Sequence, residues 1–313
     1  MSVESNLKIK MTLALLLTIL SEGVVAYIIA SFLHLPFIII FIFLGIFWLI
    51  QWLISPYLVA RNAVEITPND PYYGWIYEIV RETAMKTKTV TPKVFLVDQP
   101  FPNAFAYGNY VTGKRVAITR PLLDILTPEE LRAVIGHEIG HIKHNDVEIG
   151  MAIGLIPTIL GFISNLLINL GWVTLIFAVD ESDIIFGIIM LAIGGALFIV
   201  TFLLQIFVLW FNRLRESYAD LNSVKLFGKD AWNLATALAK IEIYMQNIRL
   251  DPFTGIIVTA APVKVKQTNP DLLVDEWLHK KVSPLSDILS THPDPAKRVQ
   301  MIYKAIFTPS RAL

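Results

Sequence analysis

Four long apolar runs constrain this chain of 313 residues more than any other feature of its sequence. They cover residues 11–33, 36–54, 149–179 and 184–211. Each run is near or above the roughly 20 residues that a helix needs to cross a bilayer. Hydrophobic residues make up 55% of the chain, which exceeds their usual share in a soluble domain. We therefore expect four transmembrane helices rather than four buried core helices.

The basic residues that flank these runs predict how the chain is oriented in the membrane. They are Lys8, Lys10, Arg61, Lys143, Arg213 and Arg215, and all fall on one side of the predicted spans. The loop between the third and fourth runs carries three acidic residues and neither Lys nor Arg. Because Lys and Arg accumulate on the cytoplasmic side, we expect a multi-pass protein of the cell membrane. Its two termini and its polar parts should then be cytoplasmic.

The polar residues lie in two stretches on either side of the second pair of runs. We divide the chain into an N-terminal transmembrane hairpin, a first polar part, a second transmembrane hairpin and a second polar part. Their bounds are 11–54, 56–146, 149–211 and 212–313, respectively. The two polar parts together are long enough to form one domain with a core of its own.

The first polar part mixes helical and strand patterns. Residues 71–86 have a helical pattern, whereas residues 94–97, 103–108 and 115–119 have the pattern of strands. The sequence Thr-Pro-Glu-Glu at residues 127–130 predicts a helix start, with Thr as N-cap, Pro in the first position and Glu three residues after the cap. The expected fold is α+β: a mostly helical domain with a small β-sheet, plus four transmembrane helices.

The helix that starts at this cap contains His137, Glu138 and His141 in an HExxH pattern. Residues four apart share a helix face, so both imidazoles can bind one metal ion. The pattern is typical of zinc peptidases, in which the Glu acts as general base. Glu138 lies about 100° around the helix from His137 and can face the attacking water. The chain has no cysteine, so zinc must be held by His and carboxylate groups.

A catalytic zinc needs a third protein ligand, and Glu216 is the best candidate. Glu216 directly follows the fourth apolar run, and the membrane hairpin returns the chain to the side that it left after His141. Asp146 and Glu148 are less suitable, because we expect them to continue the helix of His141, too near to fold back. Asp220 comes one turn after Glu216 and can accept the second N–H of a ligand His.

Gly140 lies within the HExxH helix. Glycine there costs up to about 1 kcal/mol relative to alanine. Its presence predicts that another element packs closely against this face of the helix.

Several separate motifs stand out: the HExxH helix with its Leu-Thr-Pro-Glu-Glu-Leu start, Arg-Glu-Ser-Tyr-Ala-Asp at 215–220, Pro-Asn-Ala-Phe-Ala-Tyr-Gly at 102–108, and Ser-Thr-His-Pro at 290–293 followed by Arg298. Together they resemble the HtpX family of membrane zinc peptidases, which are relatives of the CaaX prenyl protease and of OMA-type peptidases. Ser217 and Asp294 depart from the family pattern without replacing a predicted ligand. The resemblance implies a zincin-like catalytic domain formed by residues 56–146 and 212–313.

The resemblance further implies a zinc-dependent endopeptidase of the HExxH-plus-Glu type, with one Zn²⁺ per subunit. Its substrates are expected to be membrane proteins, often damaged ones, as in protein quality control and the stress response. By the same resemblance, His292 is the candidate donor to the oxyanion, and Arg298 is a candidate for holding Asp220. The strand residues Asn103, Ala104, Phe105 and Ala106 can hold an extended substrate by backbone pairing, although an ordinary sheet strand has the same pattern.

The expected partners are protein substrates and the lipid bilayer. Nucleic acid is excluded because the formal net charge is zero, and the sequence leaves the oligomeric state open. Two alternatives compete with this interpretation. A protease that cuts within the bilayer would carry HExxH in an apolar span, but here the motif lies in a polar stretch. A membrane scaffold with a structural zinc would not need the base Glu138.

Overall fold

The computed structural model describes residues 3–32, 34, 36–59, 62–246, 268–283 and 286–307. Arg61, which is one of the predicted basic flanks, and the end of the chain from residue 308 lie outside these ranges. The chain divides into two compact units. One unit comprises Met1–Met11, Ile50–Ile149 and Phe211–Leu313, and the other comprises Thr12–Leu49 and Gly150–Trp210.

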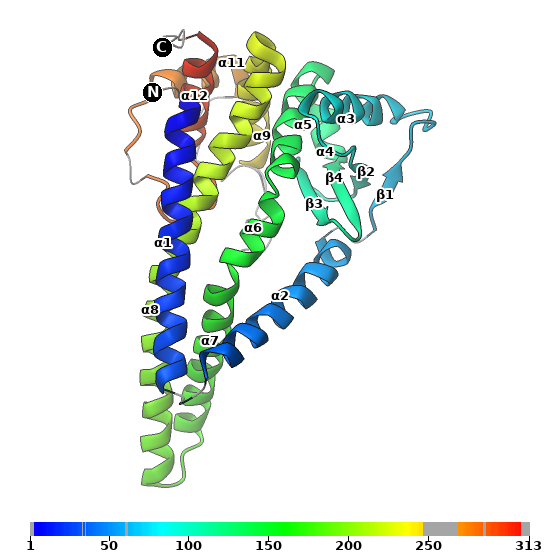
Figure 1. The fold of residues 1–313 in the computed structure, drawn as a ribbon. Helices are drawn as coiled ribbons and strands as arrows, with labels where there is room; N and C mark the ends of the chain where they lie inside the picture. The colour runs from blue at the N-terminus through cyan, green and yellow to red at the C-terminus, as the bar shows by residue number, and fades with distance from the viewer. Residues whose placement is uncertain are drawn as a thin grey trace. The chain divides into compact units, whose positions relative to one another are not determined.

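Within the described residues, four helices are long and apolar enough to cross a membrane, as the sequence predicts (Figure 1). They are α1 (Val3–Phe32), α2 (Phe37–Val59), α7 (Leu155–Ile176) and α8 (Glu181–Phe227). Helices α7 and α8 approach closely at small residues, which is how helices associate in lipid. A Cβ atom on Gly187 would lie only 2.8 Å from the Leu175 side chain. The hydroxyl of Ser164 donates to the carbonyl oxygen of Gly194 over 2.8 Å.

The polar unit contains a sheet of four strands in the order β1-β2-β4-β3 (Figure 1). The strands are β1 (Val64–Ile66), β2 (Lys93–Val97), β3 (Ala104–Asn109) and β4 (Gly113–Thr119). β2 and β4 are parallel, whereas β3 and β4 form an antiparallel hairpin in which Ala106 pairs with Val116. β3 is therefore an edge strand. β1 has only three residues, too few for a recognisable pattern, and was not expected.

Helices cover the sheet and complete the core of this unit. They are α3 (Gly74–Thr87), α4 (Arg120–Ile125), α5 (Pro128–Lys143), η1 (Gly228–Trp232), α9 (Asn233–Met245), α11 (Pro270–His279) and α12 (Pro295–Phe307). Helix α6 (Asp146–Ile153) begins in this unit, which ends at Ile149 there. Fully buried Ile76, Ile135, Leu238 and Val299 come from four of these helices and share one core. The small sheet within a mostly helical domain is the α+β fold that the sequence predicts.

Helix α5 is the HExxH helix, and two local features determine where it begins and what it packs against. The Thr127 side chain accepts from the Glu130 N–H, and the Glu130 carboxylate accepts from the Thr127 N–H over 2.8 Å. This is the predicted capping box. A Cβ atom on Gly140 would lie 3.2 Å from the Cα atom of Ala219 in α8. The close packing expected at Gly140 is thus confirmed, and the polar end of α8 is the neighbour.

Candidate metal centre

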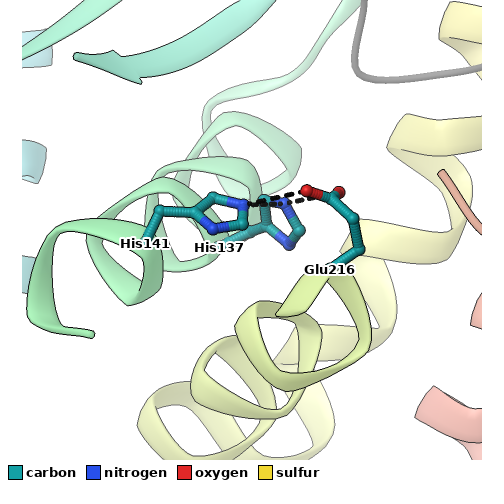
Figure 2. A group of neighbouring side chains, drawn as sticks. All are labelled: His137, His141 and Glu216. Atoms are coloured by element: carbon teal, nitrogen blue, oxygen red, sulfur yellow. Dashed lines mark hydrogen bonds and ion pairs between the residues drawn. The ribbon is translucent and has the colours of Figure 1, made fainter. Parts of the chain in front are cut away.

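Helices α5 and α8 bring three potential metal ligands together. His137 and His141 are one turn apart on α5, and their Nε2 atoms are 3.1 Å apart. Glu216 reaches them from α8: its Oε2 lies 3.5 Å from His137 Nε2 and its Oε1 lies 3.3 Å from His141 Nε2. The ligand atoms of the three residues all lie within 4.8 Å of one another. Figure 2 shows the two rings and the carboxylate converging on one point.

The remaining nitrogen of each ring faces a carboxylate. His137 Nδ1 lies 2.7 Å from Asp220 Oδ1, and His141 Nδ1 lies 2.6 Å from Asp146 Oδ2. In a neutral imidazole whose Nδ1–H points at a carboxylate, Nε2 carries the lone pair that a metal needs. Two nitrogen donors and one carboxylate, without cysteine, form a donor set that zinc accepts in catalytic sites. The chemistry of the residues present therefore fits a zinc ion.

Each of these carboxylates is held by an arginine. Arg298 of α12 donates from Nε and Nη2 to the two oxygens of Asp220, over 2.9 Å and 2.7 Å. Arg298 is only 2% exposed and Asp220 is fully buried. Arg215 Nε lies 3.2 Å from Asp146 Oδ1. Both histidines are thus oriented by an arginine–carboxylate pair. The first pair was expected from the sequence, whereas the second was not.

The assumption that Asp146 continues the helix of His141 is wrong. Helix α5 ends at Lys143, and Asn145 adopts a left-handed conformation with φ 55°. A new helix, α6, begins at Asp146, whose side chain folds back to His141. Asn is one of the few residue types that tolerate this conformation. Asn145 was therefore the available sequence signal for a break in the helix. The charge of Arg215, next to Glu216, was the signal for a partner of Asp146.

The charges around the two histidines also change their affinity for protons. Burial by itself lowers the pKa of His141, but the neighbouring carboxylates of Glu216 and Asp146 outweigh it and raise the pKa to about 10. For His137, burial is likewise outweighed, chiefly by Asp220, and the pKa lies above its usual value. Without a metal, both rings therefore hold a proton more tightly than a free imidazole does.

A cavity of about 170 Å³ lies next to the convergent ligands. Its lining includes His137, Glu138, His141, Glu216, His292, Arg215, Val147 and the β3 residues Ala104, Phe105 and Ala106. The space is large enough for several water molecules. It also brings into one place most of the residues that the sequence singles out.

Glu138 is 3% exposed, and its Oε2 accepts a hydrogen bond from the Ala106 N–H over 2.8 Å. Burial raises the pKa of Glu138 above its usual value. A carboxylate with a raised pKa, beside a metal site and in a cavity, has the properties of a general base. The hydrogen bond also ties the edge strand β3 to the HExxH helix.

The other two predicted site residues, His292 and Asn103, have different surroundings from each other. His292 Nδ1 is 3.1 Å from Glu216 Oε2, so this ring contacts a potential metal ligand as well as lining the cavity. Asn103 is fully buried, and its backbone N–H donates to the Thr119 hydroxyl over 2.8 Å. Asn103 is not among the described residues that line the cavity. Its predicted role in substrate binding stays a prediction, as does that of His292.

Comparison with known proteins places the chain among peptidases. The sequence model of Peptidase family M48 matches residues 73–306. The chain is 67% identical over 304 residues to Protease HtpX homolog 1 of Sulfurisphaera tokodaii, covering 97% of this chain and 98% of that protein. It is 61% identical over 307 residues to Protease HtpX homolog 1 of Saccharolobus solfataricus, covering 98% and 99% of the two chains.

The fold also has a counterpart among solved structures. The crystal structure of S. mikatae Ste24p matches 89% of this chain with a TM-score of 0.52 and 18% sequence identity. This chain spans 61% of the Ste24p chain, and the likeness is one of fold. The family match covers the HExxH helix, the second hairpin and Glu216, and the HtpX relatives align along nearly the whole chain. The chain belongs to peptidase family M48, as a multi-pass membrane metallopeptidase of the HtpX type.

Proposed function

We propose that the chain is a zinc-dependent endopeptidase that hydrolyses membrane proteins, including damaged ones, on the cytoplasmic side of the cell membrane. One observation carries the proposal: His137, His141 and Glu216 converge beside Glu138 in a single cavity. Zinc, when bound, acidifies water and polarises the carbonyl group of the scissile peptide bond. The remaining chemistry belongs to residues of this chain.

Glu138 is assigned the proton transfers. Its buried carboxylate is held by the Ala106 N–H, so it faces the cavity in one orientation. It takes a proton from the attacking water and delivers it to the leaving amine. His292 is assigned as donor to the developing oxyanion, since its ring lines the same cavity. Asp220 with Arg298, and Asp146 with Arg215, keep the two ligand histidines in the orientation that zinc needs.

The edge strand β3 is assigned the binding of the substrate backbone. An extended peptide can add to a sheet edge through main-chain hydrogen bonds, which tolerate many sequences. Such tolerance suits a peptidase that removes unfolded or damaged proteins. Only eight residues, interrupted by the turn at Asn145, separate His141 from Ile149, where the third apolar run opens. This short connection favours substrates that are themselves anchored in the membrane.

The variant Glu138→Gln tests the catalytic assignment. The amide keeps the shape of the side chain but cannot accept the proton of water, so we expect cleavage of an unfolded protein to fall by at least about 100-fold. Zinc content should stay at the level of the parent, because Glu138 is not a ligand. Glu129→Gln, an exposed residue at the start of the same helix, is the matched control. Activity of Glu138→Gln within a few-fold of the control would contradict the assignment.

The variant Glu216→Ala tests the third ligand. Partners of metal ligands typically contribute about 10- to 100-fold to affinity, and loss of a ligand should cost more than that. We expect zinc affinity, measured by competition with a chelator, to fall by more than about 100-fold. Glu181→Ala, which removes an exposed carboxylate at the other end of α8, should leave the affinity unchanged. Equal affinities of the two variants would mean that another residue completes the site.

The raised pKa values of the two histidines predict that zinc binding depends on pH. Below about pH 10, His141 of the metal-free chain carries a proton, which zinc must displace. Zinc affinity should therefore increase as pH rises from 6 to 8, by about tenfold per unit for each proton released. Calorimetry in buffers with different ionisation enthalpies counts the released protons. Binding without proton release near pH 7 would show that the rings are already neutral in the metal-free chain.

Reporter fusions test the cytoplasmic location of the polar domain. One reporter is fused after residue 313, and a second is inserted at residues 180–183. Because the two positions should lie on opposite sides of the membrane, each fusion is the control for the other. The distribution of Lys and Arg predicts a cytoplasmic signal from the first and an external signal from the second. The opposite pair of signals would place the metal centre outside the cell.

A further inference from the structure

The turn between strands β3 and β4 carries exposed apolar and aromatic side chains. We call its residues Tyr110, Val111 and Thr112 the hairpin tip. Tyr110 is 67% exposed and Val111 is 69% exposed. The turn is nevertheless well defined, because the Asn109 carboxamide oxygen accepts from the Val111 N–H over 2.9 Å and from the Thr112 N–H over 2.7 Å. A turn held by these two hydrogen bonds thus presents Val111 and Tyr110 outward.

The hairpin tip lies beside a helix that is long and apolar enough to span the membrane. The Asn109 side chain donates from Nδ2 to the carbonyl oxygen of Trp52 in α2, over 2.6 Å. In a regular helix this carbonyl accepts from the N–H four residues later, but residue 56 is a proline inside α2 and has no N–H. Asn109 therefore supplies the hydrogen-bond donor that Pro56 lacks. An unsatisfied carbonyl in a membrane span would be costly.

A second contact fixes the direction of the hairpin along α2. The Arg115 guanidinium lies over the Tyr57 ring, 5.7 Å from its centroid. Arg115 contacts α2 at Tyr57, and Asn109, which is nearer the tip, contacts α2 at Trp52. Toward its tip, the hairpin therefore runs along α2 toward the apolar middle of the span. The five residues from Tyr57 to Trp52 correspond to about 7.5 Å of helix. The tip lies beyond Asn109 and hence reaches at least as far along the span as Trp52.

The tip also contacts the segment that leads into the third apolar run. The Tyr110 hydroxyl donates to Asn145 Oδ1, between α5 and α6. Lys114 lies over the Tyr110 ring, 4.4 Å from its centroid, and is paired with Glu148, which directly precedes Ile149. The hairpin therefore contacts the end of the second predicted span at Trp52 and the segment before the third at Asn145 and Glu148.

We propose that the hairpin tip is a lipid-contacting anchor, with Val111 and the ring of Tyr110 inserted at the boundary between headgroups and acyl chains. Tyrosine is enriched at this depth because its ring is apolar and its hydroxyl is polar. Tyr57 and Leu58 are also exposed at the end of α2, by 63% and 62%, and Arg115 of the hairpin lies over the Tyr57 ring. The anchor would hold the edge strand β3, and the cavity that it lines, at the membrane surface. The proposal does not depend on the reaction that the cavity supports.

The absence of cysteine from the chain allows a direct test. Val111→Cys carries a single environment-sensitive fluorophore in the full-length protein, reconstituted into phosphatidylglycerol–phosphatidylcholine vesicles. We expect emission shifted to the blue, several-fold stronger quenching by nitroxide-labelled lipids than at a control position, and protection from aqueous iodide. Glu129→Cys is the matched control, because it is exposed at the opposite end of α5 from the Asn145 contact.

A label at residue 111 that iodide quenches as strongly as a label at residue 129 would overturn the proposal. Protection from iodide without quenching by the lipid nitroxides would also overturn it, because protein, such as a second copy, would then cover the tip. Tyr110→Cys repeats the measurement at a neighbouring position, should the label at residue 111 disturb folding. Zinc content equal to that of the parent shows for each labelled variant that the domain is intact.

Discussion

The close approach of α5 to α8 is the constraint on which the metal centre depends. A Cβ atom on Gly136 would lie 2.5 Å from the Phe227 ring, and one on Gly140 would lie 3.1 Å from the Asn222 side chain. Only residues without a side chain allow this distance. The Asn222 amide donates to the Gly136 carbonyl oxygen over 2.8 Å and so adds a polar contact between the helices. The same close approach of α5 to α8 places Glu216 opposite the two histidines. The packing of the two helices therefore also sets the geometry of the three ligands.

Burying charged groups around the metal centre has a cost that only close pairing can offset. Removing an ion from water costs several kcal/mol, even after the surrounding protein relaxes. Asp220 and Arg298 are almost fully buried, and their two-point contact satisfies both groups. Loss of either partner leaves the other buried and unpaired, which typically costs about 3–5 kcal/mol. Orientation of His137 is therefore coupled to the stability of the contact between α8 and α12.

The features that could be predicted from the sequence were those with a local pattern. The apolar runs, the capping box at Thr127 and the HExxH spacing each depend on residues a few positions apart. Glu216 was predictable because a membrane hairpin must return the chain to the side from which it came. Asp220 followed from the helical spacing to Glu216. The family resemblance added His292 and Arg298, which no spacing connects to the histidines.

The features that were missed depend on contacts between distant segments or on a single local break in a helix. Strand β1 is defined only by its pairing with β2, because three residues show no periodicity. Asp146 was misplaced because the left-handed turn at Asn145 interrupts what looks like one continuous helical segment. The burial of Asn103 depends on its pairing with Thr119, sixteen residues later. For β1 and Asn103 the decisive interaction is tertiary, and a single sequence does not display it, whereas the break at Asn145 is a local turn.

The order of the ligands along the chain has a consequence for biosynthesis. His141 leaves the ribosome 75 residues before Glu216, and at about 5–20 residues per second this interval lasts roughly 4 to 15 s. During this time the nascent chain offers a metal ion two histidines but no third ligand from α8. The second hairpin must be synthesised and inserted before the centre can close. A chain that stalls before residue 216 therefore lacks one of the three residues that converge on the metal centre.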